Sequence, residues 1–346
     1  MGNKNLLIWA SDLSENTGEG ILARTFLFEI QKIIKYETVK IKTLESSFNI
    51  DQLNINKIKF QETDKKTIYH KYFGPIYGAI YLLIFSRKYD VLYLNYLPFW
   101  NFIIFLILPS KTILGPITGG AYSRRVNNIN LFVRKYFFPF FYSISKIIVY
   151  GKFKNIIFST NILKDFTKED KPTLTNFIEI LFCKKFHNTN KKFDIIFYNR
   201  HHATKFYDNI KETIICLSKY HRVCVVGDHF KNDNVINFGW LERNKVLKLI
   251  QRSKLAINSA ENFLSIFGID CINNSALVVY DKNLKFTLKN KNSNYLQVNF
   301  DDINVATKKI NIFLSKTKVK KNLNWWNNII LKRKRIRDFL LSYFIK

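Results

Sequence analysis

Residues 234–281 read NVINFGWLERNKVLKLIQRSKLAINSAENFLSIFGIDCINNSALVVYD and alternate two hydrophobic patterns. Short β-rich runs predict strands, and the segments between them carry apolar residues at helical spacing. Strand, helix, strand, helix, strand with short links is typical of a parallel sheet covered by helices, so we expect an α/β domain. The predicted strands are 235–238, 255–258 and 276–280, and the predicted helices are 242–253 and 263–272.

Two carboxylates bracket the second of these predicted helices. Glu261 and Asp270 both lie near the carboxyl end of the strand predicted at 255–258. Open α/β sheets hold their ligands at that edge, so a binding role is one interpretation. The other is structural, because a carboxylate near a helix start is favoured by the helix dipole. Asp270 lies within the predicted helix, where a capping role explains it less well.

The order FGW…V…LI…S…NSAEN…FGIDCINNSALVV resembles the donor-binding half of the retaining family-four glycosyltransferases, which have the GT-B fold. In that family a Glu follows a Ser-containing strand end, and a second Glu precedes a small-residue turn and an apolar strand. Glu261 stands at the first position, and Asp270 stands at the second with one extra residue between them. The resemblance implies two Rossmann-like domains facing a cleft, with a nucleotide-sugar bound mainly by the second.

The length of 346 residues suits two domains of ordinary size. We expect an acceptor-side domain over 1–170, with the apolar run 147–150 as its last strand. Charged residues and Pro172 cluster without apolar period in 164–175, which predicts a linker. The donor domain is expected over 175–323. The resemblance implies that a last helix, 324–346, packs back on the first domain.

Arg200 and Lys205 follow a strand predicted at 193–198, on a strand-to-helix turn. A guanidinium makes forked contacts to phosphate oxygens and an ammonium supplies a point charge, so the pair suits a diphosphate. The resemblance implies that these two residues clamp the donor diphosphate. In a chain with 55 Lys and Arg, however, surface cations at this spacing are also common.

Three further positions, Gly227, Gly239 and Ser259, join Asp270 in the expected donor pocket. Gly227 follows a strand predicted at 222–226, and Gly239 precedes a Trp that is placed to cover the base. Ser259 directly follows the strand predicted at 255–258, two residues before Glu261. The resemblance implies that Glu261 orients the donor sugar or phosphate and that Asp270 binds the ribose hydroxyls.

Two glycine-containing loops are expected to face the ligand from the first domain. Gly18 and Gly20 lie between a predicted strand at 6–10 and a predicted helix at 21–34, where backbone N–H groups and a helix dipole suit an anion. Gly119 and Gly120 close the run GPITGG, residues 115–120. The run resembles one found in cell-surface polysaccharide glycosyltransferases. Ordinary tight turns and a helix cap are the alternatives.

The formal net charge of +29 favours an anionic partner or a heavily solvated lysine surface, and both interpretations stay open. The apolar run 98–108 is shorter than the ~20 residues that span a bilayer, so we expect a core helix there. The aromatic stretch 130–143 and the basic C-terminal stretch 325–346 suit either a core or an anionic membrane surface. The chain start shows no signal-peptide pattern, so we expect a peripheral protein on the cytoplasmic face of the membrane.

We therefore predict transfer of a sugar from a nucleotide diphosphate donor to a lipid-linked or cell-surface glycan acceptor. Arg200 and Lys205 would stabilise the leaving diphosphate, which is the electrostatic part of the catalysis. No Asp-x-Asp motif and no His/Cys ligand spacing indicates a metal, and no cofactor is expected besides the donor itself. The alternatives are a catalytically silent GT-B subunit that binds a glycan or a partner enzyme, and a nucleic-acid-binding protein. The last is less favoured, because the basic residues are spread along the chain and show no nucleic-acid-binding module.

Overall fold

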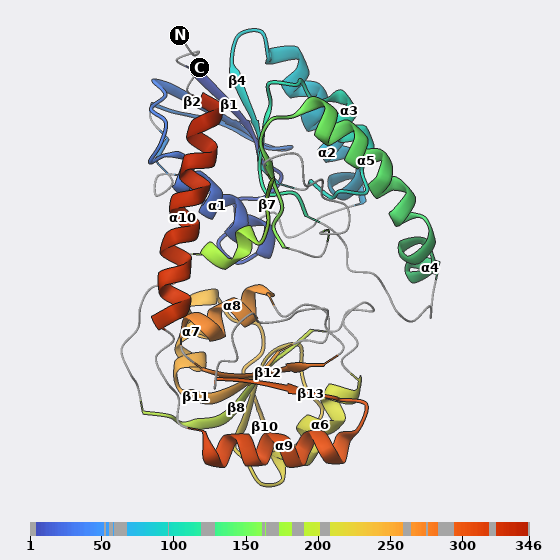
Figure 1. Ribbon diagram of the computed structural model, residues 1–346, viewed down its shortest axis with the longest axis vertical. Coiled ribbons are helices and arrows are strands. Elements are labelled where there is room, and N and C mark those ends of the chain that lie inside the picture. The colour runs from blue at the N-terminus through green and yellow to red at the C-terminus, as the bar shows by residue number, and fades with distance from the viewer. Residues whose placement is uncertain are drawn as a thin grey trace. The chain divides into compact units, whose positions relative to one another are not determined.

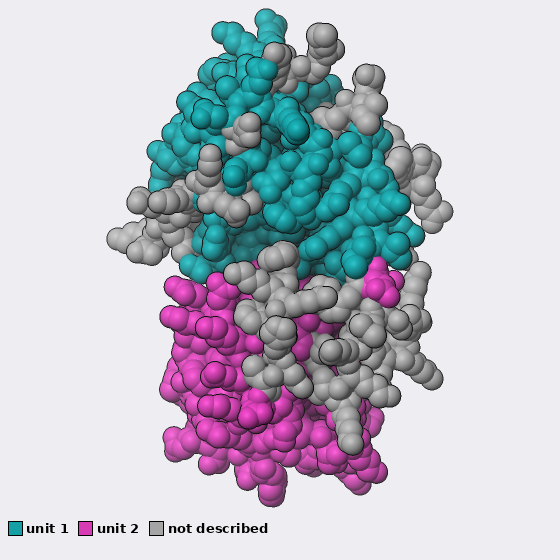
Figure 2. Space-filling model, turned by 90° about the vertical axis from the view of Figure 1, so that its left-hand side faces the viewer, with its two compact units in different colours: residues 1–181, 329–346 teal, residues 182–328 magenta. Residues whose placement is uncertain are grey.

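The chain folds into two units in the computed structural model (Figure 2). The first contains Met1–Leu181 together with Ile329–Lys346, and the second contains Phe182–Asn328. The structure describes residues 5–51, 53–54, 58, 68–95, 97–118, 129–160, 163, 173–181, 190–200, 208–258, 264–274, 276–282, 294–317 and 323–344.

The first unit is built on a five-stranded sheet of order β3-β2-β1-β4-β5. All neighbouring strands are parallel except the edge strand β3, which pairs antiparallel with β2. The strand order reverses direction between β1 and β4, so the carboxyl ends of these two strands form the switch point of the sheet. The strands are β1 (Asn5–Trp9), β2 (Thr38–Lys42), β3 (Ser47–Ile50), β4 (Asp90–Tyr93) and β5 (Ile113–Leu114).

Helices cover both faces of this sheet (Figure 1). On one side α2 contacts β1, β4 and α3, while α5 contacts α3 and α4. On the other side lie α1 and the C-terminal helix α10. The helices are α1 (Gly18–Ile30), α2 (Ile68–Phe85), α3 (Phe102–Ile107), α4 (Ile129–Tyr136), α5 (Phe138–Lys152) and α10 (Leu323–Phe344).

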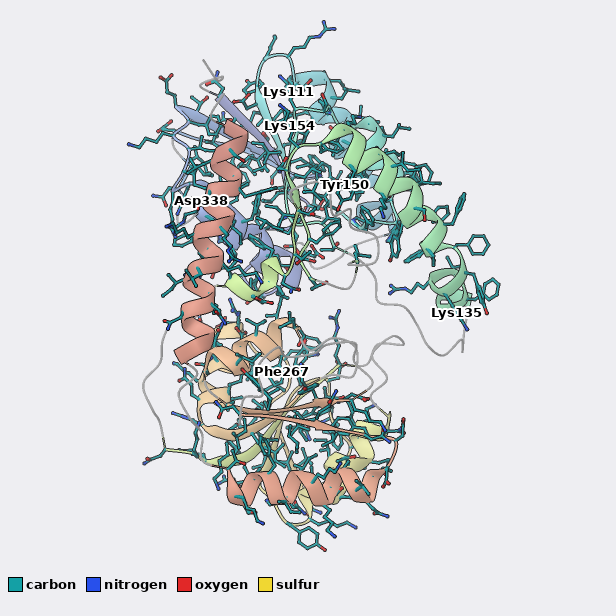
Figure 3. All side chains as sticks on the ribbon, viewed as in Figure 1. Lys111, Lys135, Tyr150, Lys154, Phe267 and Asp338 are labelled. Carbon is teal, nitrogen blue, oxygen red and sulfur yellow. The ribbon has the colours of Figure 1, made fainter. Side chains whose placement is uncertain are left out.

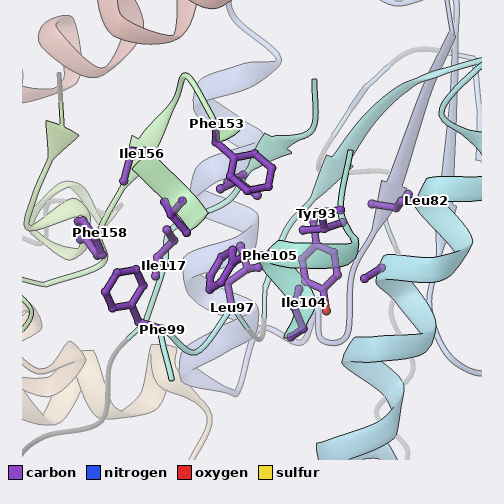
Figure 4. Close-up of a cluster of buried hydrophobic side chains, with 14 of the residues drawn as sticks. Leu82, Tyr93, Leu97, Phe99, Ile104, Phe105, Ile117, Phe153, Ile156 and Phe158 are labelled. Carbon is purple, nitrogen blue, oxygen red and sulfur yellow. The ribbon is translucent and has the colours of Figure 1, made fainter. Parts of the chain in front are cut away.

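A buried aromatic cluster joins the sheet of the first unit to α2, α3 and α5 (Figure 4). The indole of Trp9 packs against α2 at Gly78, where an added Cβ would come within 2.1 Å of the ring. Only glycine therefore allows this approach. The Tyr93 hydroxyl donates to the carbonyl of Pro75, 3.0 Å away, and burial raises the pKa of that hydroxyl. The only polar atom of the Tyr93 side chain is thus hydrogen-bonded inside the core.

Residues 147–150, predicted as a strand, lie inside α5 instead. Pro139 stands in the first turn of that helix, where its fixed φ favours helix formation. The buried residues Tyr142, Ser145, Val149 and Tyr150 recur at helical spacing, and this pattern outweighs the β-branched run. The apolar run 98–108 does form a helix, α3, but a shorter one, because Pro98 and Phe99 pair with Thr118.

The chain leaves the first unit at residue 181, later than the boundary expected near 170–175. The strands β6 (Ile156–Ile157) and β7 (Thr173–Leu174) pair in parallel. The 3₁₀ helix η3 (Phe177–Ile180) follows, and the Phe177 ring packs edge-on against Phe26 of α1 at 5.6 Å between centroids. Burial of η3 against α1 keeps this segment in the first unit.

The second unit is a six-stranded, fully parallel sheet of order β10-β9-β8-β11-β12-β13. Its switch point lies between β8 and β11, where Phe197 pairs with Ile257. The strands are β8 (Phe193–Asn199), β9 (Val223–Gly227), β10 (Val235–Asn237), β11 (Ser253–Ile257), β12 (Leu277–Asp281) and β13 (Tyr295–Val298). The helices are α6 (Asp208–Ser218), α7 (Arg243–Gln251), α8 (Ile266–Asn273) and α9 (Ile303–Lys316).

The helix α10 is attached to the first unit by ion pairs as well as by buried Ile336 and Leu340. The fully buried Glu29 of α1 accepts from the Arg337 Nε at 2.9 Å, and its other oxygen lies 3.8 Å from the Arg333 Nε. The Lys32 ammonium lies 3.3 Å from the same carboxylate. A buried carboxylate is thus compensated mainly by a helix that comes at the other end of the sequence.

We predict that Glu29→Gln lowers the free energy of unfolding by about 3 kcal/mol, because it leaves partly buried cations without their counter-charge. The control is Glu15→Gln, since the Glu15 carboxylate is 73% exposed, although its partner Arg24 is only 16% exposed. A pair whose carboxylate lies in water is expected to contribute less than about 1 kcal/mol. Urea denaturation of both variants tests this, and equal stabilities would contradict it.

Candidate functional site

The carboxyl edge of the second sheet is shaped by two buried asparagines at its switch point. Asn199 ends β8, and its Nδ2 donates to the carbonyls of Asp228 at 2.9 Å and His229 at 3.3 Å. Asn258 follows β11, and its Oδ1 accepts from the Ser265 hydroxyl at 2.9 Å. Ser265 in turn caps α8 by accepting from the Gly268 N–H at 3.0 Å. The two side chains fix the loop after β9 and the start of α8.

The expected glycines Gly227 and Gly239 are both in the left-handed region, with φ of 98° and 66°. The Gly227 N–H donates to the Gly239 carbonyl at 2.8 Å, which ties the end of β9 to the segment after β10. A Cβ at Gly227 would lie 2.2 Å from the Asn199 carbonyl oxygen, whereas one at Gly239 would meet open space. Gly227 is therefore required for close strand packing, and Gly239 for its backbone conformation.

Aromatic side chains gather at the end of β8. The Tyr198 ring stacks on Phe267 of α8 with 5.7 Å between centroids, and Trp240 meets Tyr198 edge-on at 6.1 Å. Phe267 is labelled in Figure 3. The Trp240 indole is 62% exposed, and its N–H donates to the Asp228 carboxylate at 3.0 Å. The exposed indole offers a flat apolar surface of the kind on which a base can stack.

Arg200 is the first residue after β8 and its side chain is exposed. Burial raises the pKa of the neighbouring Tyr198, the positive charge of Arg200 acts to lower it, and the negative charge of Asp228 acts to raise it. Asn199 pairs with Gly227, so Arg200 and Asp228, the next residues, follow the ends of neighbouring strands. A cation, a carboxylate and an aromatic surface thus meet at the carboxyl edge of the sheet.

Asp270 is buried in an ion pair. It lies in α8 at 2% exposure, and the guanidinium of Arg243 donates to both of its oxygens, at 3.0 and 2.6 Å. Burial raises the pKa of Asp270, while the hydrogen bonds and charge of Arg243 act to lower it. The carboxylate joins the first turn of α7 to the middle of α8. The expected contact with ribose hydroxyls stays a prediction, and the carboxylate is already engaged by Arg243.

Five expected site residues lie outside the described part of the chain. Lys205 belongs to the segment that follows β8 and Arg200, and Ser259 and Glu261 belong to the segment that follows β11 and Asn258. Because β8 and β11 are neighbours, Arg200 and Asn258, the last described residues before these segments, lie at the switch point of the sheet. Gly119 and Gly120 also lie outside the described residues.

The loop of Gly18 and Gly20 is organised by hydrogen bonds within the first unit. The Oδ1 of Asn95, just beyond β4, accepts from the Ser11 N–H at 2.7 Å, and its Nδ2 donates to the Asp12 carbonyl. Gly18 begins α1. A Cβ on Gly20 would lie 2.1 Å from the Ser14 carbonyl oxygen, so this glycine serves loop packing.

Asn95, Asn199 and Asn258 were not among the residues predicted from the sequence. Each follows an apolar run and lies at the end of a strand beside a switch point. An amide at the end of a buried strand is therefore the sequence signal that could have identified them. Among the described residues, no three His, Cys, Asp or Glu side chains gather into a metal-binding group. Metal independence stays a prediction.

No protein-family model matches the sequence, and no curated protein matches it. Solved structures do match. Sucrose-phosphate synthase from Thermosynechococcus elongatus is 11% identical with a TM-score of 0.61, over 98% of this chain and 99% of that chain. The UDP-GlcNAc 2-epimerase of Methanocaldococcus jannaschii, in complex with UDP-GlcNAc and UDP, is 11% identical with a TM-score of 0.54, over 98% and 99%.

TarM is 17% identical with a TM-score of 0.51, over 84% of this chain. This chain spans only 60% of the length of TarM. A variant of S. aureus TarM has been solved with fondaparinux, α-GlcNAc-glycerol and UDP. At these identities the similarities show the fold, and they confirm the expected GT-B architecture of two Rossmann-like units. The epimerase shares that architecture, so the fold alone does not decide the reaction.

We predict that Asp270→Asn lowers the free energy of unfolding by about 3 kcal/mol, because Arg243 loses the counter-charge of a buried pair. The matched control is Asp194→Asn, whose partner Lys254 is 48% exposed and 2.8 Å away. That change is expected to cost about 1 kcal/mol or less. Denaturant unfolding compares the two. Wild-type stability of Asp270→Asn combined with lost nucleotide affinity would instead show that Asp270 serves the ligand.

Proposed function

We propose that this protein transfers a sugar from a nucleotide diphosphate donor to a glycan acceptor. The observation that carries the proposal is the grouping of Arg200, Tyr198 and Trp240 at the carboxyl edge of the second sheet, beside its switch point. Open parallel sheets bind ligands at this place. The exposed guanidinium of Arg200 suits a diphosphate, and the exposed indole of Trp240 suits a base. The site therefore offers a contact for each end of a nucleoside diphosphate.

In the proposed reaction, charge develops on the diphosphate as its bond to the sugar breaks. Arg200 and Lys205 stabilise this charge electrostatically, which lowers the barrier without a bound metal. Ser259 and Glu261 follow β11 in the sequence. In this proposal Glu261 orients the donor sugar. We include retention of the anomeric configuration in the proposal because the sequence resembles the retaining family-four glycosyltransferases.

The acceptor in this proposal is lipid-linked or part of a cell-surface polysaccharide or lipopolysaccharide. The protein then works as a peripheral protein on the inner face of the cytoplasmic membrane. The excess of basic residues supports attraction to an anionic surface. No helix in the described part of the chain has both the length and the apolar content to cross a bilayer.

A second candidate is a catalytically silent GT-B subunit that binds a glycan or a partner enzyme. The ion pair between Asp270 and Arg243 favours it, because the carboxylate expected at the ribose is engaged within the protein. The two candidates differ in turnover. The transferase releases nucleoside diphosphate from a nucleotide-sugar, whereas the silent subunit binds without turnover. An epimerase would differ from both by isomerising the donor sugar.

We predict that Arg200→Ala lowers kcat/KM for nucleotide-sugar turnover by about 10²–10³-fold, because one donor to the leaving phosphate is lost. The assay measures nucleoside diphosphate released from a panel of nucleotide-sugars. Arg252→Ala is the matched control, since Arg252 is exposed and precedes β11 at the amino edge of the same sheet. No turnover with any donor by the wild type would reject the transferase. Salt-sensitive nucleic-acid binding in its place would favour the nucleic-acid alternative.

We also predict that Trp240→Ala weakens nucleoside diphosphate binding about tenfold, since stacking of a base on an aromatic ring contributes about 1–3 kcal/mol. Titration calorimetry with UDP measures the effect. Tyr220 is 78% exposed and precedes β9 at the amino edge, so Tyr220→Ala is expected to bind like the wild type. Equal losses in both variants would argue against a base site at Trp240.

A further inference from the structure

The helices α2, α3 and α5 of the first unit present apolar side chains to solvent. Ile84 of α2 is 65% exposed, Leu106 of α3 is 59% exposed, and Phe140 and Ile147 of α5 are 63% and 71% exposed. Phe140 and Ile147 are two turns apart and lie on one side of α5. Because α2 contacts α3 and α3 contacts α5, these stripes belong to one layer of helices. We call this surface the helical face.

The charges of this part of the chain have a single sign. Between Asp90 and Asp165 the sequence contains no Asp or Glu. Lys111, Lys135 and Lys154 are exposed, and Figure 3 labels them around α3, α4 and α5. The full set of basic residues in this interval is Lys111, Arg124, Arg125, Arg134, Lys135, Lys146, Lys152, Lys154 and Lys164.

We infer that the helical face docks on the surface of a bilayer that contains anionic phospholipid. Exposed aliphatic and aromatic side chains enter the boundary between headgroups and acyl chains, while neighbouring cations meet the lipid phosphates. A second copy of this chain fits less well, because two such faces would bring cations against cations. A nucleic-acid duplex fits less well too, since its outer surface is phosphate and sugar and its base faces are stacked inside, away from Leu106 and Ile147.

The C-terminal helix, which the sequence offers as an alternative membrane contact, is engaged elsewhere. Lys332 pairs with Glu179, Arg333 donates to the Ile180 carbonyl, and Arg337 pairs with Glu29. Three of its five clustered cations therefore hold α10 on the first unit. Among the described residues, the large exposed apolar side chains of α10 are Ile330 and Leu331, whereas the helical face presents more of them.

This inference deepens the proposed function, because a lipid-linked acceptor would be presented at the same surface. Its test uses no nucleotide-sugar donor, so the docking inference and the proposed function can fail separately.

The purified full chain is mixed with vesicles of phosphatidylcholine and phosphatidylglycerol at low salt, and the bound fraction is measured by flotation. The test variant combines Leu106→Gln, Phe140→Gln and Ile147→Gln. The matched control combines Ile330→Gln and Leu331→Gln on α10, where both residues are more than half exposed.

We expect the helical-face variant to bind vesicles at least about tenfold more weakly than the wild type, with the α10 control changed less than about twofold. Binding should also fall when phosphatidylglycerol is omitted or salt is raised. Circular dichroism and the midpoint of urea unfolding show that each variant is folded. Failure of the wild type to bind, or a loss confined to the α10 control, would overturn the inference. So would a dimer in sedimentation that the helical-face variant abolishes, because the face would then be an interface between copies.

Discussion

A buried amide side chain fixes the switch point of each sheet, and the rest of the site depends on it. Asn95 holds the loop after β1 in the first unit, and Asn199 holds the loop after β9 in the second. A buried backbone group without a partner costs about 1–3 kcal/mol, so an amide that satisfies two loop groups also decides where the loop can lie. The carboxyl edges of both sheets thus have defined loops at the places where parallel sheets bind ligands.

The sequence pattern predicts that Asp270 binds the ligand, but in the structure its carboxylate forms an ion pair with Arg243. At the second acidic position of the resembled motif the chain has the shorter aspartate, with one extra residue before it. In the structure this carboxylate faces α7, where the guanidinium of Arg243 donates two hydrogen bonds to it. Spacing along a sequence cannot show this, because Arg243 and Asp270 are joined by the packing of α7 against α8.

Much of the fold followed from hydrophobic period, because buried strands and amphipathic helices differ in period. The strands predicted at 6–10 and 193–198 and the helices predicted at 242–253 and 263–272 lie within a few residues of those observed. The failures have physical causes. The run 147–150 is rich in β-branched residues, but it forms part of α5 because every third or fourth residue of that helix is buried. For the site, Arg200 could be placed at a strand end, whereas the stacking of Tyr198 on Phe267 required the tertiary structure.

The attachment of α10 has a consequence for the order in which the chain is completed. Glu29 is made early in synthesis, and the arginine that donates to it comes 308 residues later. Until then its carboxylate has only Lys32 nearby within the described first unit. Domains generally fold in turn as they leave the ribosome. The first unit is the first to be synthesised, but it lacks α10 until the end of synthesis. The second unit can therefore form its sheet before the first unit is complete.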